Sequence, residues 1–169
     1  MARHLHLAGA PTDAGRPPEP GSPIRVILAD DHRAMRRNLR MLLELEDGIE
    51  VITEAEDLDA VVQCVHRYRP HVLILDLRLS NGSVLATIHE LRHQVPGTET
   101  VALTMEASPA FAKHALASGA LGYVLKDHAD SDLVNAVRSA ADGNIWLTPQ
   151  VEAGLRAMDR TVADRLAEG

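Results

Sequence analysis

The sequence predicts an α/β fold: a five-stranded, parallel, doubly wound sheet with helices on both faces and an extra helix at the C-terminal end. Two observations predict it. Short apolar runs alternate with longer segments in which apolar residues recur every three or four positions. The runs are continuously apolar, which is typical of strands buried on both faces. Strands of this kind, joined by helical crossovers, pair in parallel.

The strands and helices follow one another in strict alternation along the chain. The predicted strands cover residues 24–29, 50–54, 71–75, 100–103 and 121–125. The predicted helices cover residues 33–45, 58–68, 84–95, 110–118 and 130–141. Turn and cap residues agree with this division, since Ser108-Pro109 suits a helix start and Gly119 and Gly143 suit helix ends.

Two segments flank this repeating pattern. Residues 1–23 hold five of the nine prolines and show no apolar periodicity, which predicts a disordered leader without a signal peptide. Residues 24–146 form the predicted domain. Residues 147–169 predict a linker helix, because Val151, Leu155, Met158 and Val162 recur at helical spacing. This narrow stripe is compatible with packing on its own domain or with a short dimer-forming coil.

Composition excludes several classes of protein. The 169-residue chain has 17 Lys and Arg against 24 Asp and Glu, a net charge of −7, so it is a poor polyanion binder by itself. The single cysteine, Cys64, excludes an internal disulfide and favours a cytoplasmic location. The apolar runs are too short to cross a membrane, and few aromatics are available for stacking on bases.

Polar residues follow four of the predicted strands at their carboxyl ends. These are Asp30 and Asp31 after the first strand, Asp76 after the third, Thr104 after the fourth and Lys126 after the fifth. Ligands bind at this edge of an open parallel sheet, so we expect the five side chains to converge there.

A cluster of three carboxylates indicates a divalent cation, because the carboxylates repel one another unless a cation lies between them. Carboxylates with a backbone carbonyl and water suit Mg²⁺, which also favours phosphate oxygens. One carboxylate could then accept a phosphoryl group, and an ammonium and a hydroxyl suit the charge on that group.

Four segments, ILADDHRAMRRNLRMLL, LILDLRLSNGSV, ALTM and GALGYVLKD, resemble the receiver domain of bacterial two-component response regulators. The resemblance covers about residues 24–146, and it implies the flavodoxin-like sheet of receivers. The phrases ADDHR, GALGYVLKD and GNIWLTPQV are most similar to the NarL/FixJ type, whose members normally carry a C-terminal helix-turn-helix DNA-binding domain.

The resemblance implies a role for each residue of the metal site. Asp31 and Asp76 would bind Mg²⁺ directly, together with the backbone carbonyl of Arg78. Asp30 would act mainly through metal-bound water.

It also implies the residues of phosphoryl chemistry. Asp76 would be the phosphoacceptor, Thr104 would bond the phosphoryl group after transfer, and Lys126 would pair with one of its oxygens. Tyr123 would be the switch aromatic that turns inward when Thr104 moves.

The resemblance further implies partners. A sensor histidine kinase would supply the phosphoryl group, and the receiver would catalyse only its own phosphorylation and dephosphorylation. Phosphorylation could produce a homodimer, and DNA would be bound only through a helix-turn-helix domain beyond Gly169, so we expect the chain to be truncated. No membrane partner is expected.

Two other functions stay open at this point. A receiver switched by a small ligand or partner protein is suggested by Ser80 and Val84, where the family often has proline and glycine. An aspartate-nucleophile phosphatase is disfavoured, because such enzymes need a general acid where Arg78 stands.

Overall fold

The computed structural model describes residues 18–167, with side chains as far as Arg160. Residues 1–17 of the predicted leader and residues 168–169 of the predicted linker therefore lie outside the described part. Among the described residues, no helix is both long enough and apolar enough to cross a lipid bilayer.

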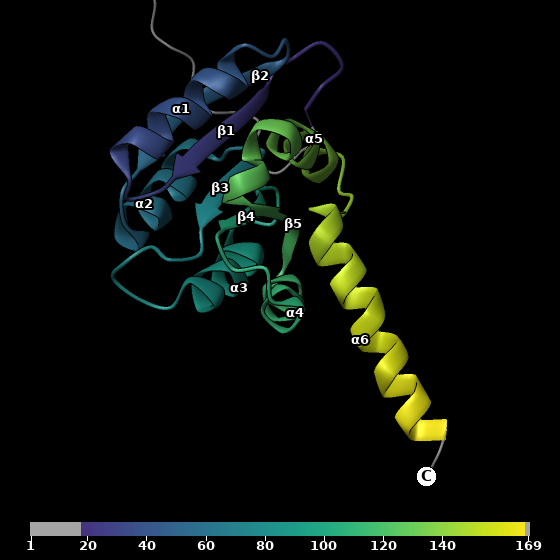
Figure 1. The fold of residues 1–169 in the computed structure, drawn as a ribbon. Coiled ribbons are helices and arrows are strands. Elements are labelled where there is room, and N and C mark those ends of the chain that lie inside the picture. The colour runs from purple at the N-terminus through teal and green to yellow at the C-terminus, as the bar shows by residue number, and fades with distance from the viewer. Residues whose placement is uncertain (1–17, 168–169) are drawn as a thin grey trace, which may run out of the picture.

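The sheet is fully parallel, as predicted, with the strand order β2-β1-β3-β4-β5-β6. Figure 1 labels the first five strands. The order reverses beside β1, which places a crevice at the carboxyl ends of β1 and β3. The strands are β1 (Ile24–Ala29), β2 (Ile49–Ala55), β3 (Val72–Asp76), β4 (Glu99–Thr104), β5 (Ala120–Leu125) and β6 (Trp146–Leu147).

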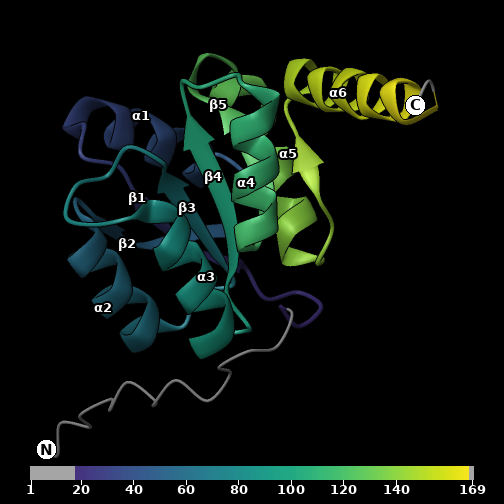
Figure 2. The ribbon, with the colours of Figure 1, turned by 90° about the horizontal axis from the view of Figure 1, so that it is seen from below.

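Helices cover both faces of the sheet, which confirms the doubly wound prediction (Figure 2). Helices α1 (Arg33–Glu44) and α5 (Ala129–Ala141) pack on one face. Helices α2 (Leu58–Tyr68), α3 (Val84–Gln94) and α4 (Pro109–Ser118) pack on the other. The central strands β1 and β3 are buried on both sides, in agreement with their continuous apolar sequences.

The sixth strand is an addition to the five that the sequence predicts. β6 has only two residues, and it pairs with Gly122 and Tyr123 at the outer edge of β5. A strand of this length has no periodicity of its own, so only its pairing with β5 identifies it.

Helix α6 (Pro149–Ala167) leaves the domain at β6 and extends away from it (Figures 1 and 2). Its first turns pack against α4: Val151 is buried, and Gly154 lies so close to Pro109 that an added Cβ would be 2.6 Å from the proline Cγ. Lys113 and Asp159 form an ion pair of 3.5 Å further along the same contact.

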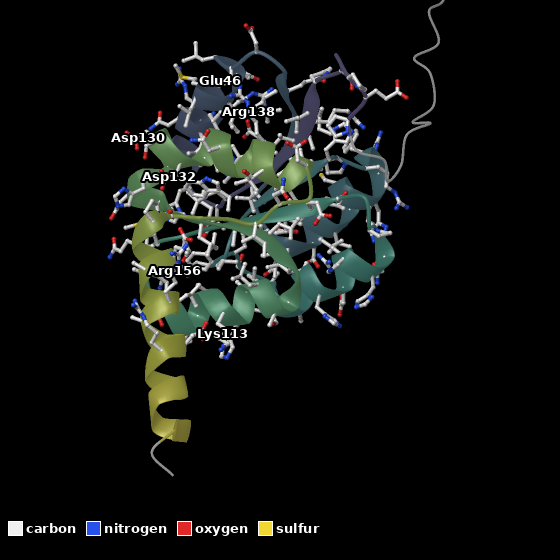
Figure 3. All side chains as sticks on the ribbon, turned by 90° about the vertical axis from the view of Figure 1, so that its right-hand side faces the viewer. Glu46, Lys113, Asp130, Asp132, Arg138 and Arg156 are labelled. Atoms are coloured by element: carbon white, nitrogen blue, oxygen red, sulfur yellow. The ribbon has the colours of Figure 1, made fainter. Side chains whose placement is uncertain are left out.

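Ion pairs also join elements on the opposite side of the molecule. Arg138 of α5 pairs with Glu46, in the turn after α1, at 2.9 Å (Figure 3). Both side chains are partly exposed, so the pair contributes little to stability. The two apolar clusters on either side of the sheet carry the packing energy.

Candidate functional site

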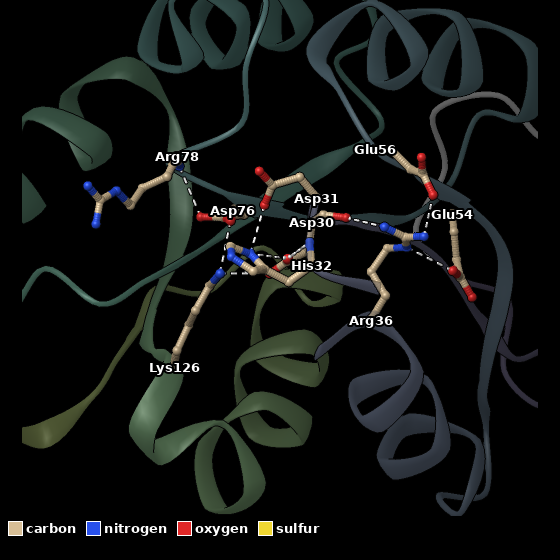
Figure 4. Close-up of polar contacts among 9 residues, drawn as sticks. All are labelled: Asp30, Asp31, His32, Arg36, Glu54, Glu56, Asp76, Arg78 and Lys126. Carbon is tan, nitrogen blue, oxygen red and sulfur yellow. Dashed lines mark hydrogen bonds and ion pairs between the residues drawn. The ribbon is translucent and has the colours of Figure 1, made fainter. Parts of the chain in front are cut away.

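Three strands of the sheet bring their carboxyl ends together at one point. Asp30 follows β1, Asp76 ends β3 and Lys126 follows β5 (Figure 4). Their side chains touch: the Lys126 Nζ lies 2.7 Å from Asp30 Oδ2 and 2.9 Å from Asp76 Oδ2. Residues that are 50 and 96 positions apart thus form one buried ion-pair cluster. The predicted convergence of these residues is observed.

The carboxylate of Asp76 is fully buried and held at both oxygens. Its Oδ2 accepts the hydrogen bond from Lys126, and its Oδ1 accepts one from the backbone N–H of Arg78 at 2.9 Å. The second bond comes from the loop directly after β3. The side chain is therefore held by this loop and by Lys126, which follows β5. Asp76 is therefore preorganised at the floor of the site.

Lys126 is charged in this setting. Burial works against its positive charge, but the hydrogen bonds to Asp30 and Asp76 outweigh burial and raise the pKa of the ammonium above its ordinary value. The 3₁₀ turn η1 (Lys126–His128) starts at this residue and connects β5 to α5. This one ammonium bonds two of the three carboxylates of the cluster, which therefore keeps an excess of negative charge.

Asp31 and His32 form the exposed rim of the cluster. The Asp31 carboxylate is 45% exposed, and the His32 Nδ1 lies 2.8 Å from Asp31 Oδ1 and 3.2 Å from Asp30 Oδ1. One possible ligand atom from each of Asp30, Asp31, His32 and Asp76 lies within 4.8 Å of the others. The excess negative charge and the oxygen-rich donor set fit a hard divalent cation such as Mg²⁺.

Thr104 and Tyr123 lie beside the cluster. Thr104 ends β4, one residue beyond Leu103, which pairs with Asp76, and its Oγ1 accepts a hydrogen bond of 3.1 Å from the Glu106 N–H. Tyr123 is fully buried, and its hydroxyl donates a 2.6 Å hydrogen bond to the carbonyl oxygen of Glu106. Burial, with the nearby Glu106 charge, raises the pKa of Tyr123 to about 12.

A surface cavity opens next to Thr104. Arg78, Thr104, Glu106 and Phe111 are among the residues that line it. The cavity reaches from the loop after β3 to the start of α4, so it lies over the loop that Tyr123 contacts.

Arg78 occupies the expected place in the chain, and its backbone N–H bonds Asp76 in the cluster. Its side chain points away from Asp76 (Figure 4). The role of its carbonyl as a metal ligand stays a prediction.

Two residues at the site, His32 and Arg36, are not predicted from the sequence. His32 directly follows Asp30-Asp31, and its ring bends back over both carboxylates. Arg36 is a buried arginine behind Asp30 that contacts Glu54 and Glu56 at the end of β2 (Figure 4). One signal was available: Arg36 shares the helical spacing of Leu39 and Leu43, which places a charge on the buried face of α1.

The family comparison matches residues 26–138 to the response regulator receiver domain. Among curated proteins, the chain is similar to the oxygen regulatory protein NreC of Staphylococcus carnosus (33% identity; 78% of this chain and 61% of the relative). It is also similar to the nitrate/nitrite response regulator protein NarP of Escherichia coli (34% identity; 80% and 63%). The chain thus spans about three fifths of the length of these relatives.

Solved structures show the same fold. One is the isolated REC domain of RcsB from Salmonella enterica serovar Typhimurium in the presence of the phosphomimetic BeF₃⁻ (29% identity; 79% of this chain and 99% of that chain; TM-score 0.73). Another is a LuxR-family two-component response regulator from Aurantimonas sp. (28% identity; 83% and 99%; TM-score 0.77).

Proposed function

Because the chain belongs to the response regulator receiver family, we propose that it is a phosphorylation-switched signalling domain with Asp76 as its phosphoacceptor. The observation that carries the proposal is the setting of Asp76. Its carboxylate is buried at the end of a central strand, hydrogen-bonded by Lys126 and by a backbone N–H, and bordered by two further carboxylates.

The proposed reaction is transfer from a phosphohistidine of a sensor histidine kinase. An Asp76 carboxylate oxygen forms a bond to phosphorus while the N–P bond of the donor breaks, and the donor imidazole leaves with the electron pair and takes a proton from water. Lys126 holds its ammonium beside Asp76 Oδ2, where it would pair with a phosphoryl oxygen as charge builds up. After transfer, the Thr104 hydroxyl would donate a hydrogen bond to the same phosphoryl group.

Mg²⁺ would supply the positive charge that lets an anionic donor approach three carboxylates. We assign Asp31 and Asp76 as direct ligands with the Arg78 carbonyl, and Asp30 as a residue that acts through water. The chemistry of the donor set supports this assignment, because oxygen atoms from three carboxylates lie within 4.8 Å of one another.

The proposed output is a change around Thr104 and Tyr123. Tyr123 bonds the same residue, Glu106, whose N–H bonds Thr104, so movement of Thr104 toward a phosphoryl group would disturb the contact of the tyrosine. This coupling supports a switch that reaches the β4–α4 loop. We propose homodimer formation on phosphorylation and transcriptional output through DNA binding, as one structural relative is a complex of RcsB dimers with DNA.

Mass spectrometry after incubation with acetyl phosphate and Mg²⁺ tests the phosphoacceptor. We expect one phosphoryl group on the wild-type chain and none on Asp76→Asn. Asp59→Asn is the matched control, because Asp59 is an exposed carboxylate on α2, and it should be phosphorylated like wild type. Phosphorylation of Asp76→Asn would refute the assignment.

A titration with Mg²⁺ alone separates this function from that of a receiver switched by a small ligand or a partner protein. Binding that Asp31→Asn weakens supports the phosphorylation switch. A wild-type chain that neither binds Mg²⁺ nor takes up phosphate would favour a receiver switched by a small ligand or a partner protein.

A further inference from the structure

We propose that Arg36 is a positioning residue of the site: it fixes the peptide between Asp30 and Asp31 so that both carboxylates face a bound Mg²⁺. The inference rests on the proposed function, because it concerns the same metal. It adds a residue that touches neither the metal nor the phosphoryl group.

The contacts of Arg36 converge from three sides. Its Nη1 donates a 2.7 Å hydrogen bond to the backbone carbonyl of Asp30. Its Nε lies 3.0 Å from Glu54 Oε2, and its Nη2 lies 2.5 Å from Glu56 Oε1 (Figure 4). The residue is only 5% exposed, so helix α1, the end of β1 and the end of β2 meet at this one guanidinium.

Arg36 acts by fixing the orientation of the groups that it bonds rather than through its net charge. Two carboxylates, those of Glu54 and Glu56, already balance its positive charge. Burial opposes the charged form, yet the contacts with Glu54 and Glu56 outweigh it and raise the pKa of the guanidinium. A balanced guanidinium adds little field at the carboxylates, but its planar fork holds the atoms that it bonds in fixed directions.

The bonded carbonyl belongs to the peptide that joins the two metal-site aspartates. The rotation of this peptide sets the direction in which the Asp31 side chain points. Among the contacts described, the partly exposed Asp31 carboxylate is paired only with the exposed side chain of His32. Arg36 bonds the carbonyl of this peptide, and the next N–H along the chain, that of His32, holds the Asp30 side chain through a 2.7 Å bond to Oδ1. Outer residues that orient metal ligands in this way typically change metal affinity about 10–100-fold when removed.

Arg40 provides a matched control on the same helix. It lies one turn further along α1 and bonds Glu54 at 2.9 Å, Glu44 at 2.8 Å and the Val51 carbonyl at 3.3 Å. It therefore shares the glutamate of Arg36 and ties α1 to β2, but its bonds lead to β2 and α1 instead of Asp30. Comparison of variants at Arg36 and Arg40 separates the loss of an arginine contact with β2 from the loss of the contact with the Asp30 carbonyl.

The test is isothermal titration of Mg²⁺ into Arg36→Met, Arg40→Met and the wild-type chain, each checked for native circular dichroism. We expect the Mg²⁺ dissociation constant of Arg36→Met to rise about tenfold or more, and that of Arg40→Met to stay within about twofold of wild type. Equal affinity in Arg36→Met and wild type, or an equal loss in both variants, would overturn the inference. No Mg²⁺ binding by the wild-type chain would overturn this inference by removing its metal, and a lack of phosphate uptake in addition would refute the proposed function.

Arg36→Lys covers the case in which Arg36→Met does not fold. A lysine keeps the charge but cannot bond Asp30 and both glutamates in one plane, so weakened Mg²⁺ binding is again expected, and unchanged binding contradicts the proposal. The amide resonance of Asp31, which belongs to the anchored peptide, gives a second readout. It should shift in the Arg36 variants without metal and stay in place in Arg40→Met.

Discussion

Among single residues, Lys126 supplies the positive charge that compensates the buried carboxylates of the site. Its ammonium is the cation between Asp30 and Asp76, two carboxylates that are themselves fully buried. Buried charges are tolerated when they are paired, and removal of one partner leaves the others without compensation. The stability of the metal-free domain should therefore depend on this one side chain.

Substitution of Lys126 by Met should lower the free energy of unfolding by about 3–5 kcal/mol, because two buried carboxylates lose their partner. Urea denaturation in the presence of a chelator measures this change, and added Mg²⁺ should restore part of it by taking the place of the lost charge. Lys113→Met, which breaks the exposed pair with Asp159, should cost only about 0–1 kcal/mol. Similar stabilities of the two variants would contradict the role given to Lys126.

Tyr123 gives a prediction in alkaline solution. Burial, with the charge of Glu106, holds its pKa at about 12 in the folded chain, against an ordinary value of 10.0. The unfolded chain thus loses this proton first, so the stability that the neutral hydroxyl contributes is complete below pH 10.0 and is lost as the pH rises toward about 12. Absorbance at 295 nm should show a tyrosine ionising near that upper value, and Tyr123→Phe should remove the transition. Ionisation of all tyrosines near their ordinary value would refute it.

The residues of the cluster itself could be predicted because each follows a recognisable apolar strand. Asp30, Asp76, Thr104 and Lys126 need only the parallel order of the strands to come together. Arg36 could not be placed in the same way, because its partners Asp30, Glu54 and Glu56 depend on which way one side chain turns. His32 likewise joins the cluster through a side-chain rotation that no spacing encodes.

At the level of elements, one hydroxyl just before helix α6 joins it to β5, the strand that precedes Lys126. The Thr148 Oγ1 accepts a hydrogen bond from the Leu125 N–H at 3.1 Å and donates one to Asp132 Oδ2 at 3.0 Å. The Thr148 N–H also donates to the Tyr123 carbonyl at 3.0 Å. The residue that leads into α6 is thus bonded to Tyr123 and Leu125 of β5 and to Asp132 of α5.

Thr148→Val should destabilise the domain by about 1–3 kcal/mol, since it leaves the buried Leu125 N–H without its acceptor. Hydrogen exchange should then quicken at Leu125 and in the first turn of α6. Thr148→Ser keeps the hydroxyl and should behave nearly like wild type. Unchanged exchange at Leu125 in Thr148→Val would show that the bond from the Leu125 N–H to Thr148 does not tie the start of α6 to β5.

Gly154 tests the contact between α6 and α4. Alanine favours a helix by about 1 kcal/mol over glycine, but a Cβ at this position would lie 2.6 Å from Pro109 Cγ. Gly154→Ala should therefore weaken the docking of α6 although it suits the helix, and nuclear Overhauser contacts between α6 and Pro109 should diminish. Ala153→Gly, at an exposed neighbouring position, should lower helix stability and leave those contacts in place. Retained contacts in Gly154→Ala would contradict the close approach.

The element boundaries follow the sequence closely where packing is periodic and less closely elsewhere. Helix α2 and strand β1 begin and end where the apolar pattern predicts. The two-residue strand β6 depends on pairing with β5, a contact between distant segments. The stripe of α6 begins with Val151, which is buried against the domain, so this part of the helix packs on its own fold.

For the whole molecule, metal binding and folding are linked. The site is assembled from the ends of β1 and β3 and the start of η1, so its carboxylates are gathered only in the folded chain. An ion that binds the folded state and not the unfolded one stabilises the fold by mass action. The net charge of −7 adds a general attraction for cations, which any test must separate from binding at the site.

Mg²⁺ at about one hundred times its dissociation constant should therefore add about 2.7 kcal/mol to the free energy of unfolding. For a domain of this size that corresponds to a rise of roughly 5–10 °C in Tm. Scanning calorimetry with and without Mg²⁺ measures it, with sodium chloride at matched ionic strength as the control for screening and a chelator to reverse the effect. Asp31→Asn should lose most of the rise, because it removes a site carboxylate whose side chain is partly exposed and is not bonded to Lys126. An equal rise with sodium chloride, or in Asp31→Asn, would mean that general screening of the acidic surface stabilises the chain.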